Sequence, residues 1–107
     1  MTNKLKQLAE RMGYEVIYTE SGKLAKYDDK MCVRKDGELL AYDPANNPKQ
    51  CYELQNDFKI ELQWDGDEKE WLAMSCTGIE MAAIGKTLGE AVTACAIEIM
   101  KGESDGN

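Results

Sequence analysis

The sequence predicts an α+β fold, and two hairpin patterns and one helical stripe support this prediction. Apolar and polar residues alternate over residues 58–64, which is typical of a half-buried strand, and a second apolar run at 71–76 follows an acidic loop. An Asp-Gly pair separates two further strand-like runs, and apolar residues recur at helical spacing near the end of the chain. We therefore expect a mostly antiparallel sheet of about five to six strands with three helices packed on it, in the order α-β-β-β-α-β-β-(β)-α.

A first helix is expected after Thr2 or Asn3, either of which can cap it, and Gly13 should end it. Four apolar residues fall on one face of this helix: Leu5, Leu8, Ala9 and Met12. Residues 14–19 alternate as a strand and lead into a turn. Residues 24–30 show no clear period and are expected to form a poorly ordered connection.

The Asp36-Gly37 pair predicts a tight hairpin between residues 31–35 and 38–42, because a type I′ turn needs positive φ at both central positions. This register pairs Met31 with Tyr42, Val33 with Leu40 and Lys35 with Glu38. Two apolar pairs then follow an ion pair that lies next to the turn.

A second helix should begin after Asn47, with Pro48 at its first position, and should lead directly into the strand that starts at Phe58. Two registers are open for the hairpin that follows. A three-residue loop would place Trp64 opposite Leu72, and a two-residue loop would place Trp64 opposite Trp71. We expect the first register, because it matches apolar with apolar residues along the strands and turns Trp71 to the other face.

The last part of the chain predicts a turn at Thr77-Gly78, then a strand or a loose connection at 79–84, of which we expect the strand. A capping box, Thr87 to Glu90, begins the closing helix, and Gly102 should end it. Its apolar stripe should pack on the strand face made by Ile60, Leu62 and Trp64, and consists of Leu88, Ala91, Val92, Cys95, Ala96 and Ile99. Residues 1–102 are expected to form a single domain, and 103–107 a disordered acidic tail.

Composition argues against several classes of function. The net charge of −7, from 20 acidic and 13 basic residues, opposes binding to a phosphate backbone, so no nucleic-acid partner is expected. The chain has no histidine and its four cysteines are far apart, so neither a metal nor a cofactor is expected. No apolar run approaches the ~20 residues that span a bilayer. We expect buried, reduced cysteines and a cytoplasmic location, without a membrane partner.

No catalytic constellation is present, so the sequence predicts a protein that is not an enzyme and that binds another protein or forms a homo-oligomer. The alternative is a small-molecule or nucleotide-binding module with an aromatic-lined cleft. The acidic loop lacks the twelve-residue ligand spacing of an EF-hand calcium site. The candidate interaction surface combines aromatic, acidic and apolar residues: Tyr42, Tyr52, Trp71, Asp65, Asp67, Glu68 and Ile97.

Three groups of residues suggest a family. The pattern begins with residues 8–10 and 12–16, continues with Tyr42 ahead of the helix at 47–57, and ends with Trp71 and the helix start from Thr87 to Ala94. With these residues the chain resembles the small bacteriophage proteins grouped as the phage α-β-α sandwich domain. The resemblance implies helices against a sheet in a phage or prophage protein of unassigned role, which would be located in the host cell cytoplasm. It implies no catalytic residues, and the chain departs from the pattern at 20–30 and at 46–48.

Overall fold

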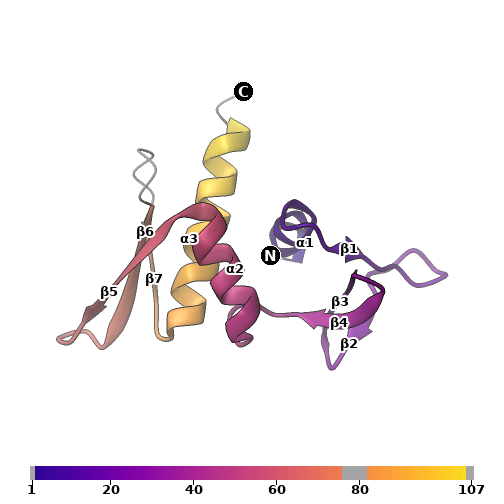
Figure 1. The fold of residues 1–107 in the computed structure, drawn as a ribbon, viewed down its shortest axis with the longest axis horizontal. Coiled ribbons are helices and arrows are strands. Elements are labelled where there is room, and N and C mark those ends of the chain that lie inside the picture. The colour runs from indigo at the N-terminus through magenta and orange to yellow at the C-terminus, as the bar shows by residue number, and fades with distance from the viewer. Residues whose placement is uncertain (1, 76–81, 106–107) are drawn as a thin grey trace. The chain divides into compact units, whose positions relative to one another are not determined.

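The computed structural model describes residues 2–75 and 82–105, which form three helices and two antiparallel sheets (Figure 1). The α+β class is therefore confirmed. The strands are divided between a four-stranded and a three-stranded sheet, which differs from the single sheet of five or six strands that was expected. The chain separates into two compact units, Met1–Asp43 and Pro44–Asn107, and each sheet belongs to one of them.

The first unit packs one helix on a small sheet. Its elements are α1 (Thr2–Arg11), β1 (Glu15–Val16), β2 (Lys26–Tyr27), β3 (Lys30–Lys35) and β4 (Glu38–Tyr42). Leu8 and Ala9 on the predicted face of α1 are fully buried, and Gly13 follows the helix with a φ of +87°, as glycine does past a helix end. The core beneath α1 is formed by Ala9, Tyr14, Val16, Met31, Val33 and Tyr42.

The predicted register of the β3–β4 hairpin is confirmed at all three pairs, Met31 with Tyr42, Val33 with Leu40 and Lys35 with Glu38. Asp36 and Gly37 have φ values of +54° and +83°, which is the backbone geometry that the two-residue turn requires.

The segment before β3 differs from the expectation. The predicted strand at 14–19 is reduced to two residues of β1 and a bridge between Tyr18 and Leu24. The predicted connection at 24–30 contains β2, which joins β3 through a tight turn with positive φ at Asp28 and Asp29. The reason is that β1 and β2 both pair with β3, so neither can extend along its whole length.

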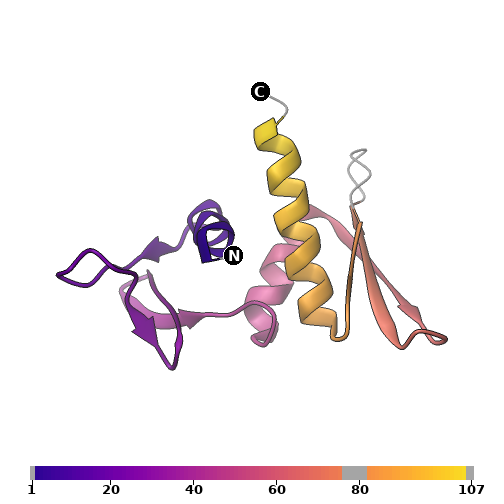
Figure 2. The ribbon, with the colours of Figure 1, turned by 180° about the vertical axis from the view of Figure 1, so that it is seen from behind.

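The second unit places two helices against a three-stranded sheet. Its elements are α2 (Pro48–Phe58), β5 (Ile60–Asp65), β6 (Glu70–Ser75), β7 (Ala82–Gly85) and α3 (Leu88–Asp105), with the strands in the order β5-β6-β7. Figures 1 and 2 show α3 running alongside this sheet, and it contacts all three strands.

The start of α2 is confirmed, because Gln50 N–H donates to the Asn47 side chain at 3.1 Å. The predicted start of the next strand was wrong by two residues. Phe58 is the last residue of α2, where it is 3% exposed, and Lys59 ends the helix in the left-handed region at a φ of +54°. Phe58 also fits the helical spacing of Cys51 and Leu54, and this packing decides its conformation.

The expected register of the β5–β6 hairpin was wrong. Trp64 pairs with Trp71 and Ile60 with Ser75, which is the register of the two-residue loop. Residues 66–69 form the loop, and Asp65 Oδ1 closes it by accepting the N–H groups of Asp67 at 3.1 Å and Glu68 at 3.2 Å. Trp71 and Ala73 therefore share the face of Trp64, and the two indole rings stack at a tilt with centroids 5.2 Å apart.

Helix α3 begins as predicted, since Glu90 N–H donates to Thr87 Oγ1 at 3.2 Å. Its predicted stripe is buried except for Leu88 at the exposed first turn, and Ile97 lies half-buried on the other side. The helix continues to Asp105, so the expected end at Gly102 was wrong, and residues 103–105 are helical instead of disordered. A single glycine destabilises a helix by only about 1 kcal/mol, which is too little to end α3, because the turn before Gly102 buries Ile99 and Met100.

The Thr77-Gly78 turn lies outside the described residues, whereas β7 confirms the second half of the expected strand at 79–84.

Candidate functional site

The sheet of the second unit has two different faces, because side chains alternate along each strand. The inner face carries Ile60 at 4% exposure and Ala73 at 0%, and both helices of the unit lie on its side (Figures 1 and 2). Gly85 shows how closely α3 approaches: a Cβ added there would lie 2.5 Å from the Ala91 backbone nitrogen.

The outer face combines large apolar side chains with carboxylates. Its residues are Glu61, Gln63 and Asp65 on β5, Glu70, Leu72 and Met74 on β6, and Ala82 and Ile84 on β7. Ile84 is 61% exposed, although isoleucine is among the residue types most often buried. The face therefore has an apolar centre that neither α2 nor α3 covers.

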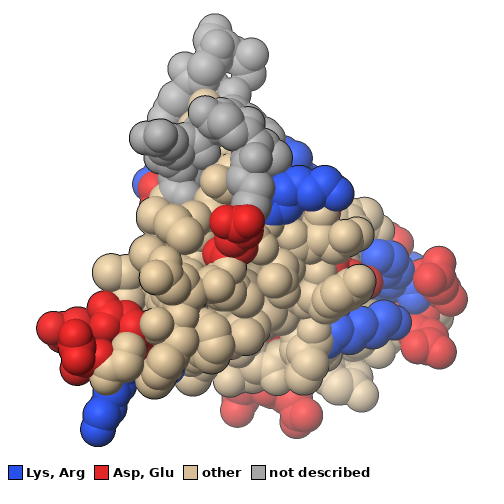
Figure 3. All heavy atoms as spheres, turned by 60° about the vertical axis from the view of Figure 1, so that its left-hand side comes forward, with Lys and Arg blue, Asp and Glu red and all other residues tan. Residues whose placement is uncertain are grey.

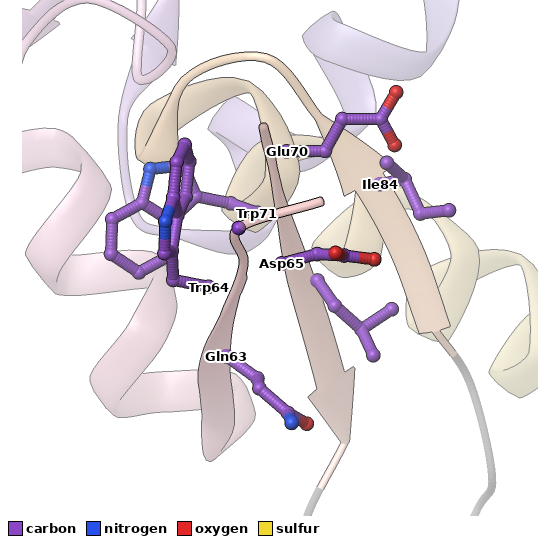
Figure 4. Close-up of a pocket in the computed structure, with 8 residues that line it drawn as sticks. Gln63, Trp64, Asp65, Glu70, Trp71 and Ile84 are labelled. Carbon is purple, nitrogen blue, oxygen red and sulfur yellow. The ribbon is translucent and has the colours of Figure 1, made fainter. Parts of the chain in front are cut away.

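A hollow of about 360 Å³ opens at the hairpin end of this face. Its lining comes from β5, the loop, β6 and β7: Gln63, Trp64, Asp65, Gly66, Glu70, Trp71, Leu72 and Ile84. Figure 4 shows Asp65 and Ile84 extending to one side of the strands and the two tryptophan rings to the other. By the strand alternation, Leu72 and Ile84 belong to the outer face, whereas Trp64 and Trp71, which also line the hollow, belong to the inner one.

The charge around the hollow is mainly negative. Lys86 Nζ forms an ion pair with Glu70 Oε1 at 3.0 Å, which partly neutralises that carboxylate. Asp65 faces the loop amides, and Asp67 and Glu68 are exposed in the loop. Figure 3, with the β5–β7 side brought forward, shows a broad area without charged side chains, and acidic and basic side chains at its margin. The result is a largely uncharged surface whose border near the hairpin loop has more carboxylates than lysines.

The structure brings together only part of the predicted interaction surface. Asp65, Asp67, Glu68 and Trp71 all lie at the end of the β5–β6 hairpin. The inclusion of Tyr42 was wrong: it is 1% exposed and packs on the Tyr14 ring, with centroids 5.1 Å apart, in the core of the first unit.

The two remaining candidates lie on helices of the second unit. Tyr52 is on α2 and is 67% exposed, and Ile97 is half-buried on α3. The outer face of the sheet contains neither of them.

Sequence reasoning missed the apolar centre of the site, Leu72 and Ile84. The register of the two-residue loop, which was not the one expected, places Leu72 opposite Gln63 and therefore on the outer face. Ile84 belongs to a run whose alternation is too weak to assign a face from the sequence alone.

The described residues offer little for covalent or metal chemistry. Within residues 2–75 and 82–105, no three His, Cys, Asp or Glu side chains are grouped to hold a metal ion. Cys32, Cys51 and Cys95 are buried thiols, as expected, whereas Cys76 lies outside the described residues. Burial raises the pKa of the Cys51 thiol, which keeps it protonated and poorly nucleophilic near neutral pH.

Comparison of the chain with protein-family models, curated proteins and solved structures gives no match. Among the described helices, none is long and apolar enough to cross a membrane.

Proposed function

We propose that this chain is a non-enzymatic protein that acts by binding another protein through the outer face of the β5–β6–β7 sheet. The observation that carries the proposal is the apolar centre of exposed Ile84 and half-buried Leu72 beside a hollow with a mainly acidic border. Exposed apolar area rimmed by polar residues is typical of protein interaction sites. A phage origin, which the sequence pattern suggests, would place this partner in a bacterial cell.

The chemistry of the face defines the partner. The hollow suits an apolar side chain, which would contact Leu72 and Ile84. The carboxylates of Asp65, Asp67 and Glu68, together with the net charge of −7, favour a partner segment that carries lysine or arginine. Charge of this kind mainly raises the association rate and selects among partners, while the apolar contact supplies affinity.

The alternative of a nucleotide or small-molecule site has less support. Its premise was a cleft walled by aromatic rings, whereas the Trp64 and Trp71 rings extend to the opposite side of the sheet from Ile84 (Figure 4). An acidic border also opposes a phosphate group.

Affinity capture from bacterial lysate tests the proposal. The full chain is used beside Gln63→Lys and Ile84→Lys, which place a positive charge at either side of the apolar centre. Both variants should lose a partner that the wild type captures saturably, and capture should weaken as salt rises. Leu39→Lys is the matched control, because Leu39 is a 50% exposed apolar strand residue in the first unit. Equal capture by all four proteins, or no saturable partner, would contradict the proposal.

A further inference from the structure

The strand β7 is an unprotected edge. In the described part of the chain it pairs with β6 on one side and with no strand on the other. The other strands at sheet edges each carry a charged residue, Glu15 on β1, Lys26 on β2, Glu38 on β4 and Glu61 on β5. The β7 sequence, Ala-Ala-Ile-Gly, carries none and contains no proline. Charges and prolines are the usual devices that keep sheet edges from pairing with other chains.

We infer that two copies of this chain associate through β7, strand beside antiparallel strand about a twofold axis. The two three-stranded sheets then form one continuous six-stranded sheet. This inference goes beyond the proposed function and does not depend on it, because it concerns the purified chain alone.

The charge distribution favours this edge over β5 for pairing with a second copy. Copies with a net charge of −7 repel one another, so their association is least opposed where the paired strands carry no charge. Pairing through β5 would bring Glu61 and Asp65 of one copy against the same carboxylates of the other. Pairing through β7 keeps the two β5 strands five strand spacings apart, about 24 Å. That separation exceeds the Debye length of about 8 Å at physiological ionic strength, so the repulsion is largely screened.

The side chains of β7 also fit this pairing. Ile84 continues the cross-strand row of Gln63 and Leu72 on the outer face, and a second copy would extend the row beyond it. Ala82, Ala83 and Gly85 are small and do not hinder the approach of another backbone. A seam of four residues is short, so the dimer should be reversible and weaker than one with a standard interface of about 1,600 Å².

Sedimentation of the purified full chain over a range of concentrations tests the inference. The average mass should rise from 12.0 kDa toward twice that value. Ile84→Lys should weaken association roughly tenfold or more, because the twofold axis brings the two new charges together. Gln63→Lys is the matched control in the same cross-strand row but at the opposite edge, and it should dimerise at least as well as the wild type.

Two further measurements separate this dimer from partner binding. Added salt should strengthen the dimer, because it screens like charges, whereas it should weaken capture of a basic partner. Amide hydrogen exchange at Ala82–Gly85 should slow as protein concentration rises, with β5 unchanged.

The outcomes are distinct for the two proposals. Gln63→Lys and Ile84→Lys both abolish partner capture if the outer face binds a partner, but only Ile84→Lys disrupts the dimer. A wild-type chain that stays monomeric at all concentrations, with β7 amides that exchange at a constant rate, would overturn the dimer and leave the partner proposal intact. Equal loss of dimer in both variants would also overturn it, since the seam would then not lie at β7.

Discussion

Replacing Gly89 with alanine tests the closest packing in the second unit. Gly89 lies in the first turn of α3, where alanine would ordinarily stabilise a helix by about 1 kcal/mol. A Cβ at this position, however, would lie well inside van der Waals distance of the Ala45 carbonyl oxygen and 2.7 Å from its carbonyl carbon. Real Cβ atoms essentially never come closer than 3.0 Å, and the obstacle is backbone that cannot rotate away. We expect a net destabilisation of about 2–4 kcal/mol, since α3 must shift from the segment before α2.

Denaturant and thermal unfolding measure this effect. For a unit of this size, such a loss lowers Tm by roughly 10 °C or more, out of a total stability of about 5–15 kcal/mol. Gly66→Ala is the control, because its nearest neighbour would be Trp64 Nε1 at an ordinary 3.8 Å. That variant should stay within about 0.5 kcal/mol of the wild type. A Gly89→Ala protein that melts at or above the wild-type temperature would refute the reasoning, because helix propensity alone would then decide the outcome.

Three other substitutions or conditions have defined outcomes. Ile99→Asp should unfold most of the second unit, because Ile99 is 3% exposed, whereas Ile97→Asp, at a half-buried position, should lower Tm much less. Equal Tm values would mean that the buried face of α3 is assigned wrongly. Trp71→Leu should remove the exciton-coupled signal that the stacked indoles give in far-ultraviolet circular dichroism, and a wild type without that signal would contradict the hairpin register. Burial raises the pKa of the Cys51 thiol, so this group contributes stability below the ordinary cysteine pKa of about 8.5 that is lost as pH rises through the folded value. Unfolding at increasing pH should show this loss in the wild type and less of it in Cys51→Ala.

The elements predicted best from the sequence are those in which neighbouring residues allow only one backbone conformation. The β3–β4 register followed from Asp36-Gly37, because few residues accept two successive positive φ values. The start of α2 followed from Asn47 and Pro48, whose cap and fixed φ act within one turn. In such places the prediction needs no knowledge of the rest of the fold.

The elements that were predicted wrongly depend on contacts between residues that are distant in sequence. The short strands β1 and β2 exist because both pair with β3, and their own residues contain no signal of that arrangement. Phe58 fits a helix and a strand equally well by period, and burial within the second unit decides for the helix. The division into two sheets likewise follows from packing in each unit and not from any marker at Asp43 or Pro44.

The register of the β5–β6 hairpin decides where the candidate site lies, because a shift of one residue moves every side chain of a strand to the other face. Matching large apolar residues across the strands favoured the wrong register. A better criterion is the size of the residues where α3 packs on the sheet. Helix α3 presents the small residues Ala91, Cys95 and Ala96, and a close approach requires small residues opposite them on the strands. Only the observed register turns Ala73 inward, with Gly85 beside α3, and it consequently turns Leu72 outward beside Ile84. The exposed apolar face that we assign to a partner is therefore a direct consequence of the close packing on the opposite side of the sheet.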